Sequence, residues 1–266
     1  MTDQLEYHMI NVATAVDRRE QMDGEFERAG LAGRVQVFDA ITPATLDRVP
    51  SKYNEQTSRL LFRRPQRDTE MGCSLSHLAL WRQLIASSAA AYVIVEDDAL
   101  IDPDLPAVAD ALLESYREGR HSGCVRLSTQ NEVPTISRTP LTEGRELARL
   151  RRVGLGTAGY FITSEAAEQM LPHCERLWAC IDRMMTHHWA YGLPIHAVLP
   201  YPVQHRPDVV SLIGDEQRTS KGEIVSLKNL YASRSFKLLD RIAQRVPQAV
   251  THRLARSVAS RHRRAA

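Results

Sequence analysis

Residues 92–99 limit the fold of this chain more than any other segment. The segment begins as an apolar, β-branched run, which predicts a buried strand, and it ends in three consecutive carboxylates, Glu96, Asp97 and Asp98. Like charges at a strand end repel one another and lose hydration unless a cation or a substrate proton compensates them. In open α/β sheets, ligands bind outside the carboxyl ends of the strands. The triplet therefore predicts a ligand site at such an edge.

A divalent cation is one candidate ligand for this triplet. Mg²⁺ and Mn²⁺ prefer oxygen ligands and commonly share them with substrate phosphates. The alternative is a loop of solvated acids that follows an edge strand. The three residues alone do not favour one interpretation over the other.

The composition is typical of a soluble globular protein. The 266 residues suffice for one large domain or for a domain with an appendage, and a hydrophobic fraction of 43% with 25% charged residues is ordinary for such domains. The four cysteines show no CxxC spacing, which argues against a zinc site or a disulfide framework and favours a reducing cytosol. Cys174 and Cys180 could still pair in an oxidising compartment.

The sequence predicts a cytoplasmic protein that is at most peripherally attached to a membrane. The first residues contain no basic region followed by an apolar run, as a signal peptide would. No apolar stretch approaches the ~20 residues that a membrane-spanning helix needs.

The order of the apolar segments predicts an α/β sheet. A strand over residues 7–12 precedes a helix with Met22 and Phe26 on one face, and a second strand follows at 35–38. Residues 42–68 show little periodicity, which predicts a long connection of the kind that often carries function.

The strongest helix prediction covers residues 69–86. Thr69 is a candidate N-cap, and apolar residues recur at steps of three and four along the predicted core face. Ser74 and His77 lie off that apolar stripe.

The rest of the chain continues the alternation of strands and helices. The expected order is a helix at 105–118, a strand at 123–128, an irregular stretch at 129–152, a glycine-rich turn and strand at 154–163, a helix capped by Ser164 through Leu171, a helical stretch at 181–189, a strand at 195–199 and a proline-framed segment at 200–207.

Four motifs occur in order along the chain. They are Met-Ile-Asn-Val at 9–12 with Asp-Arg-Arg at 17–19, Glu-Met-Gly-Cys-Ser-Leu-Ser-His at 70–77 with Trp81, Val-Glu-Asp-Asp-Ala at 95–99, and Gly-Thr-Ala-Gly-Tyr-Phe-Ile at 156–162 with Ile-Asp at 181–182. Together these motifs resemble glycosyltransferase family 25, the lipopolysaccharide and lipooligosaccharide biosynthesis glycosyltransferases. One departure is visible, because Val12 and Ala13 follow Asn11 where the family has Leu-Asp.

The resemblance implies a GT-A-like fold, which is a nucleotide-sugar-binding α/β sheet flanked by helices, and a divalent metal, Mn²⁺ or Mg²⁺. Glu96 and Asp98 stand at the positions of the acidic metal motif, and Asp98 is the first choice for a direct ligand. His205 is expected to be a third metal ligand, and Asp97 to contact sugar or ribose. The alternative is that Glu96 or Asp97 only caps the following turn.

The resemblance also implies a set of donor and acceptor contacts. An arginine after the first strand, Arg18 or Arg19, could bind a diphosphate. The alternative is that Asp17, Arg18 and Arg19 form an ordinary polar helix start. The glycine-rich turn predicts close approach of backbone to a sugar, or a β-bulge. His77 could be a satisfied structural residue. The expected substrate-binding residues are Asn11, Asp17, Arg18, Arg19, Ser74, His77, Asp97, Gly156, Thr157, Gly159 and Gln204.

Asp182 is the candidate general base. An inverting transferase needs one carboxylate to accept the proton of the acceptor hydroxyl, an effect typically worth ~10²–10⁴ in rate. Asp182 follows an apolar stretch, so burial is expected to raise its pKa. It could instead be a helix cap beside Arg183.

Residues 228–266 predict a separate unit after a glycosyltransferase domain at 1–227. This tail is rich in Lys and Arg, its only acid is Asp240, and its apolar residues recur at steps of three and four. Such a basic amphipathic α-helical extension could lie on an anionic membrane surface, at the inner face of the inner membrane. It could instead be a helical hairpin packed on the core. Nucleic-acid binding is not expected.

The sequence thus predicts an inverting, metal-dependent glycosyltransferase. By resemblance it would move a hexose, galactose from UDP-galactose in the first instance, to a saccharide of lipopolysaccharide, lipooligosaccharide or another surface glycan. Two alternatives are a metal-dependent phosphoesterase using the three acids and a non-enzymatic protein that binds membranes or polyanions through the tail.

Overall fold

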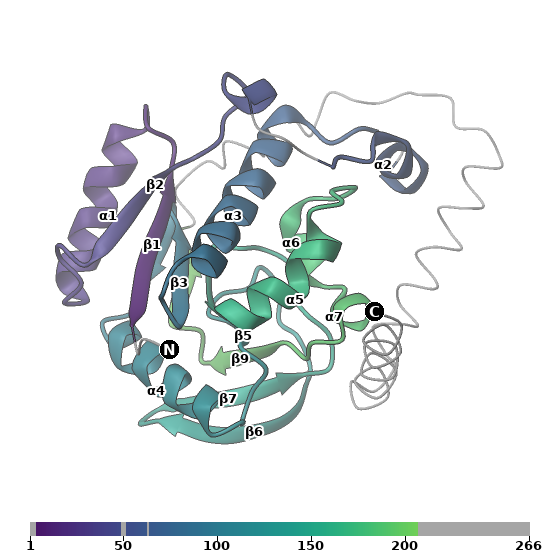
Figure 1. Ribbon diagram of the computed structural model, residues 1–266. Coiled ribbons are helices and arrows are strands. Elements are labelled where there is room, and N and C mark those ends of the chain that lie inside the picture. Colours follow the sequence, from purple (N-terminus) through teal and green to yellow (C-terminus); the bar gives the residue numbers. More distant parts are fainter. Residues whose placement is uncertain (1–3, 49–51, 63, 207–266) are drawn as a thin grey trace.

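An eight-stranded mixed sheet forms the centre of the protein (Figure 1). The computed structural model describes residues 4–48, 52–62 and 64–206. The strand order is β2-β1-β3-β8-β5-β9-β7-β6, and a two-stranded ribbon of β4 and β10 lies beside it. The strands are β1 (Leu5–Asn11), β2 (Val35–Asp39), β3 (Ala91–Glu96), β4 (Ala99–Ile101), β5 (Cys124–Arg126), β6 (Thr135–Thr142), β7 (Arg145–Leu150), β8 (Gly159–Thr163), β9 (His196–Leu199) and β10 (Val203–His205).

The strand directions bring several chain segments to one edge of this sheet. β1 pairs in parallel with both β2 and β3, and β5 pairs in parallel with β9. β8 lies between β3 and β5 and runs antiparallel to both. The carboxyl ends of β1 and β3 therefore lie beside the amino end of β8, which is where the acidic triplet and the glycine-rich turn meet.

Helices cover both faces of the sheet (Figure 1). Alternate side chains of β3 point to opposite faces, so Val93 and Val95 pack with α1 and α4, whereas Tyr92 and Ile94 pack with α3 and α5. The helices are α1 (Val16–Arg28), the 3₁₀ turn η1 (Leu46–Arg48), α2 (Glu55–Phe62), α3 (Asp68–Ala86), α4 (Leu105–Arg117), α5 (Ser164–Cys174), α6 (Ile181–Met185) and α7 (His188–Tyr191). The predicted α/β sheet flanked by helices is confirmed.

Two helix starts differ from the prediction by one or two residues. The N-cap of α3 is Arg67, not Thr69, and the side chain of Glu70 accepts a hydrogen bond from the Arg67 backbone N–H at 2.9 Å. The N-cap of α5 is Thr163, not Ser164, and its hydroxyl accepts from Ala166 N at 3.2 Å. In both cases a side chain three residues away satisfies a backbone N–H at the start of the helix.

Two stretches predicted to be irregular contain regular structure. The connection after β2 holds η1 and α2, and residues 129–152 hold the β6–β7 hairpin. β6 is the last strand of the sheet and most of its side chains are exposed, so it lacks the alternation that marks a half-buried strand. Pro140 is tolerated there because an edge strand has one unpaired side. The proline-framed segment likewise contains β10, which pairs with β4.

The predicted tail, 228–266, lies outside the described residues. Among the helices that the structure describes, none combines the length and the apolar character needed to cross a membrane.

Candidate active site

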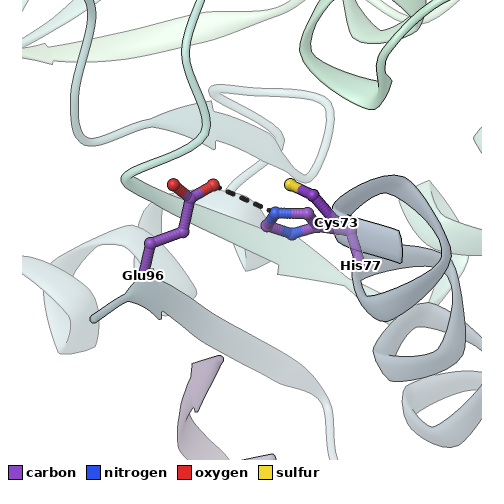
Figure 2. A group of neighbouring side chains, drawn as sticks. All are labelled: Cys73, His77 and Glu96. Atoms are coloured by element: carbon purple, nitrogen blue, oxygen red, sulfur yellow. Dashed lines mark hydrogen bonds and ion pairs between the residues drawn. The ribbon is translucent and has the colours of Figure 1, made fainter. Parts of the chain in front are cut away.

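Glu96 ends β3 on the face that α3 covers. It has the same strand parity as Tyr92 and Ile94, so its carboxylate points toward α3, where it meets His77 (Figure 2). His77 Nε2 lies 3.1 Å from Glu96 Oε1, and the Thr157 hydroxyl donates to the same oxygen. Burial alone would raise the pKa of Glu96, but the hydrogen bonds from His77 and Thr157 hold that pKa below its ordinary value.

A chain of hydrogen bonds fixes the tautomer of His77. Trp81 Nε1 donates to the Tyr160 hydroxyl at 2.8 Å, because an indole N–H can only donate. The Tyr160 hydroxyl lies 3.0 Å from His77 Nδ1 and can donate a hydrogen bond to it. His77 then carries its proton on Nε2 and donates it to Glu96. Trp81, Tyr160 and His77 are all fully buried, so water does not compete for these hydrogen bonds.

Asp97 faces the end of β1. Its two carboxylate oxygens accept from Asn11 Nδ2 and from Arg18 Nη1, each at 2.9 Å. Asn11 is 2% exposed, so this contact is an internal one that fixes the turn after β1. The structure brings together these three predicted residues, and it leaves Arg18 on the wall of a large cavity.

Asp98 lies beside His205, which the β4–β10 pairing brings back to the end of β3. Asp98 Oδ2 is 3.1 Å from His205 Nε2, and Asp98 Oδ1 is buried without a hydrogen-bond partner in the described chain. Burial, together with the charge of Glu96, raises the pKa of Asp98 to about 6. An unpaired carboxylate oxygen next to an imidazole nitrogen suits a divalent cation. Asp98 and His205 therefore fit the predicted metal better than Glu96 does, since Glu96 Oε1 already accepts two hydrogen bonds.

A second group could in principle hold a metal. Cys73, His77 and Glu96 offer ligand atoms that lie within 4.8 Å of one another (Figure 2). His77 and Glu96, however, already bind each other. Burial and the charge of Glu96 raise the pKa of the Cys73 thiol well above its ordinary value, so the thiolate that a metal requires is disfavoured.

Two cavities meet at the carboxylates. A cavity of about 750 Å³ lies over the ends of β1 and β2 and is lined by Ile10, Val12, Ala13, Thr14, Arg18, residues 39–45, Thr69, Cys73, His77, Glu96, Asp97 and Asp98. A cavity of about 420 Å³ lies on the other side, toward the glycine-rich turn and α6, and includes Thr157, Asp182 and His205. Cys73, Glu96 and Asp98 line both of them.

Asp182 lies in the smaller of these cavities, within the first turn of α6. Its Oδ2 accepts from Gly156 N at 3.1 Å and its Oδ1 accepts from Arg183 N at 2.6 Å. The glycine-rich turn and α6 thus orient one carboxylate at the cavity wall. Gly156 has φ +93°, a backbone conformation that favours glycine, so this turn depends on that residue.

Six predicted contacts do not reach either cavity, and one of them is Asn11, whose side chain binds Asp97 inside the protein. The Ser74 hydroxyl donates to Glu70 O and accepts from Ile181 N, so it joins α3 to α6 instead of facing a ligand. A Cβ on Gly159 would meet the Val203 side chain at 2.8 Å, so the close approach there is to β10 and not to a sugar. The remaining three residues are exposed and line neither cavity, namely Asp17, Arg19 and Gln204.

Two parts of the site were missed in the sequence. Residues 39–45 line the larger cavity, and only 42–45 of them belong to the connection at 42–68 that is predicted to be irregular. Their position at the end of β2 and directly after it, at the carboxyl edge of the sheet, is the available signal. Tyr160 lies in the predicted strand and in the family motif at 156–162, but its link to His77 depends on the pairing of β3 with β8 and is not visible in the sequence.

Comparison with known proteins shows which family the sequence belongs to. The sequence model of glycosyltransferase family 25, described as an LPS biosynthesis protein, matches residues 4–185. The lacto-N-neotetraose biosynthesis glycosyltransferase LgtE of Neisseria meningitidis serogroup B is 28% identical over 207 residues, which cover 74% of this chain and 72% of LgtE. LgtB of the same organism is 28% identical over 166 residues, 61% of this chain and 59% of LgtB.

Two more distant similarities add little to the family assignment. A human protein named inactive glycosyltransferase 25 family member 3 is 24% identical over 213 residues, which are 76% of this chain but 32% of that protein. Among solved structures, the glycosyltransferase GlyE of Streptococcus pneumoniae TIGR4 aligns with a TM-score of 0.38 at 7% identity over 97% of this chain and 64% of that chain, a likeness too low to bear on function. Because the family match spans more than half of its residues, this chain belongs to glycosyltransferase family 25 and is an enzyme of the glycosyltransferase type.

Proposed function

We propose that this enzyme is an inverting, metal-dependent hexosyltransferase that moves galactose from UDP-galactose to a saccharide acceptor of lipopolysaccharide, lipooligosaccharide or another surface glycan. The observation that carries the proposal is that two cavities share a wall made of Cys73, Glu96 and Asp98. A transferase needs two substrate spaces that meet at the reacting centre, and the carboxylates mark that meeting point.

The larger cavity suits the nucleotide-sugar donor. Its volume of about 750 Å³ is typical of a small-molecule site. Arg18 lines it and forms an ion pair with Asp97 at 2.9 Å, and its guanidinium has further N–H donors that can bind a diphosphate in this cavity. Residues 39–45 also line this cavity and can contact a nucleoside.

Asp98 and His205 would hold the divalent cation, with Glu96 beside them. When bound, a divalent cation stabilises the negative charge that develops on a leaving diphosphate. The Trp81–Tyr160–His77 chain keeps Glu96 in one orientation at this point.

Asp182 serves as the general base from the smaller cavity. The backbone N–H groups of Gly156 and Arg183 orient its carboxylate. As the acceptor oxygen forms its bond to the anomeric carbon, the bond from that carbon to the phosphate oxygen breaks and the electron pair leaves with the nucleotide. The acceptor proton passes to Asp182.

Relatives support the class of acceptor. LgtE and LgtB are named for the biosynthesis of lacto-N-neotetraose, and a Haemophilus influenzae relative for that of lipooligosaccharide. A lipid-linked acceptor would place the enzyme at the inner face of the inner membrane. The basic sequence at 228–266 would support that attachment through anionic lipid headgroups.

Calorimetric titration with UDP-galactose, UDP-glucose and UDP-N-acetylglucosamine, with and without Mn²⁺, tests the proposal. We expect manganese-dependent binding of UDP-galactose, lost in Asp98→Asn and kept in Asp110→Asn, an exposed acid on α4. Tight binding of a different sugar nucleotide would correct the donor. Binding without transfer to any saccharide would place the chain with inactive relatives such as the human one.

A further inference from the structure

A third cavity extends the acceptor side of the site away from the metal residues. Its volume is about 300 Å³, and it is lined by Ser58 and Phe62 of α2, by Arg64 and by residues of α6. It shares Glu70, Leu155, Cys180 and Asp182 with the 420 Å³ cavity. The candidate base Asp182 therefore stands on the wall between the two spaces. Figure 1 shows α2 beyond the N-terminal end of α3, on the side where α6 lies.

Gln66 is a buried residue that lines this third cavity. It is 7% exposed, and neither its Nε2 nor its Oε1 has a hydrogen-bond partner in the described chain. Its backbone N–H is held by the Tyr53 hydroxyl at 2.8 Å, so its position is fixed. A buried amide without partners is costly, and a group that both donates and accepts would satisfy it. A sugar hydroxyl is such a group.

The other walls suit an uncharged sugar ring. Phe62 lines the cavity and stacks on Trp178, with ring centroids 6.1 Å apart and an interplanar angle of 15°. This fixed aromatic surface can pack against the C–H face of a pyranose. Arg64 forms a two-pronged ion pair with Glu70 at 2.7 and 2.6 Å, which offsets the charge of its guanidinium, and Asp182 and Arg183 add one charge of each sign to the lining. The charges of the lining therefore balance, which suits a neutral ligand.

The cavity does not end at Gln66. A polar space of about 460 Å³ lies beyond it, and among the residues lining the two spaces only Gln66 is common to both. The spaces thus follow one another from the donor cavity past Asp182 to α2. This order is what a chain of sugar units would require.

We propose that the third cavity, beside α2, binds the second sugar unit of the acceptor. This unit is a neutral hexose whose hydroxyl forms a hydrogen bond with Gln66 and whose ring packs on Phe62. This inference rests on the proposed function, since it assumes that a saccharide presents its hydroxyl to Asp182. The acceptor class is accordingly an oligosaccharide of at least two units, and a single hexose fills only the first part of the site.

Matched acceptors that differ by one unit test the inference. The pairs are methyl β-galactoside and methyl β-lactoside, methyl β-glucoside and methyl β-cellobioside, and the methyl glycosides of N-acetylglucosamine and chitobiose. We would measure kcat/KM for each member with UDP-galactose and Mn²⁺ and compare the disaccharide-to-monosaccharide ratio between enzymes. The variants are Gln66→Leu, Phe62→Leu and the control Gln56→Leu, which changes an exposed glutamine on α2.

We expect Gln66→Leu to lower the ratio about tenfold, the effect of one lost hydrogen-bonded pair, by raising the acceptor KM. Phe62→Leu should lower the ratio too, and Gln56→Leu should leave it unchanged. The unfolding midpoint of Gln66→Leu should equal or exceed that of the wild type, because no protein hydrogen bond is removed. A residue with a structural role would show the opposite pattern.

Two results would overturn the inference while the proposed function stands. One is a wild-type disaccharide-to-monosaccharide ratio near one in every acceptor pair to which the enzyme transfers sugar. The other is an equal loss of kcat/KM on the monosaccharide and the disaccharide in the Gln66 and Phe62 variants. If the wild type transfers sugar to no acceptor of either length, the proposed function fails and this inference fails with it.

Discussion

Asp98 and His205 meet across the β4–β10 ribbon, with 3.1 Å between Asp98 Oδ2 and His205 Nε2. The backbone fixes this pair as well, because Arg206 N donates to Asp98 O at 2.9 Å on the same side of the ribbon. A short strand far along the chain thus completes the acidic end of β3. The pair is the part of the site that best fits a divalent cation.

Replacing His205 tests the role of this pair. We expect His205→Ala to raise the Mn²⁺ concentration for half-maximal transfer about 10- to 100-fold, because one ligand nitrogen is lost while Asp98 remains. Saturating Mn²⁺ should restore part of the rate. Gln204→Ala changes the adjacent residue, which is exposed and lines neither cavity, and it should change neither value by more than about twofold. An unchanged metal requirement in His205→Ala would remove His205 from the metal site.

The hydrogen-bond chain behind Glu96 predicts a coupled loss in Tyr160→Phe. The phenylalanine ring would leave Trp81 Nε1 and His77 Nδ1 without partners in a fully buried place, so we expect a loss of about 1–3 kcal/mol in the free energy of unfolding. Transfer should fall as well, because His77 can then turn its ring away from Glu96. Urea unfolding and kcat measure the two effects.

A double-mutant cycle with Trp81→Phe provides the control. The double variant removes both partners of the Trp81–Tyr160 bond, so it should lose less stability than the two single variants together. Strict additivity of the two losses would show that this hydrogen bond does not act as part of a unit.

Gly156→Ala should impair transfer more than a matched glycine variant does. A Cβ at Gly156 would lie 2.9 Å from Gln130 Cγ, at φ +93°, so the turn that donates to Asp182 must shift. Gly144→Ala has a similar φ of +72° in the β6–β7 turn but meets nothing within 4 Å. Both should lose about 1–3 kcal/mol of stability from the backbone conformation, and only Gly156→Ala should lower kcat. Equal kcat values in the two variants would contradict the role given to the turn.

Buried histidines predict that the fold weakens in mild acid. Burial lowers the pKa of His121 to about 4 and that of His196 to about 3, from the ordinary value of 6.5. The unfolded chain therefore binds these protons first, and stability falls as the pH drops below 6.5 and continues to fall until each folded pKa is reached. The slope is about 1.4 kcal/mol per pH unit for each residue, so each contributes a loss of about 2 kcal/mol at pH 5.

His196→Leu isolates one of these contributions. Urea unfolding at pH 7.5 and at pH 5.0 should show a decrease in stability about 2 kcal/mol smaller in the variant than in the wild type. The same decrease in both proteins would mean that His196 is protonated in the folded state.

The local pattern of the chain predicted the centre of the fold and the position of the site. Short apolar runs mark β1, β2 and β3 within one or two residues, and the face to which Glu96 points follows from its position in β3. The pattern failed at β6, where an exposed edge strand has no buried face to reveal it, and at α2, which lies in a polar connection.

The sequence by itself determined that three carboxylates follow a buried strand and that the family motifs occur in order around them. Only the tertiary structure decided what each side chain contacts. Ser74 and His77 lie one turn apart on α3, yet the Ser74 hydroxyl bonds to the backbone of α6 while His77 reaches Glu96. Periodicity records which face of an element is buried. The pairing of distant strands and the packing of helices determine which residues meet that face, because these contacts join segments that are remote in the sequence.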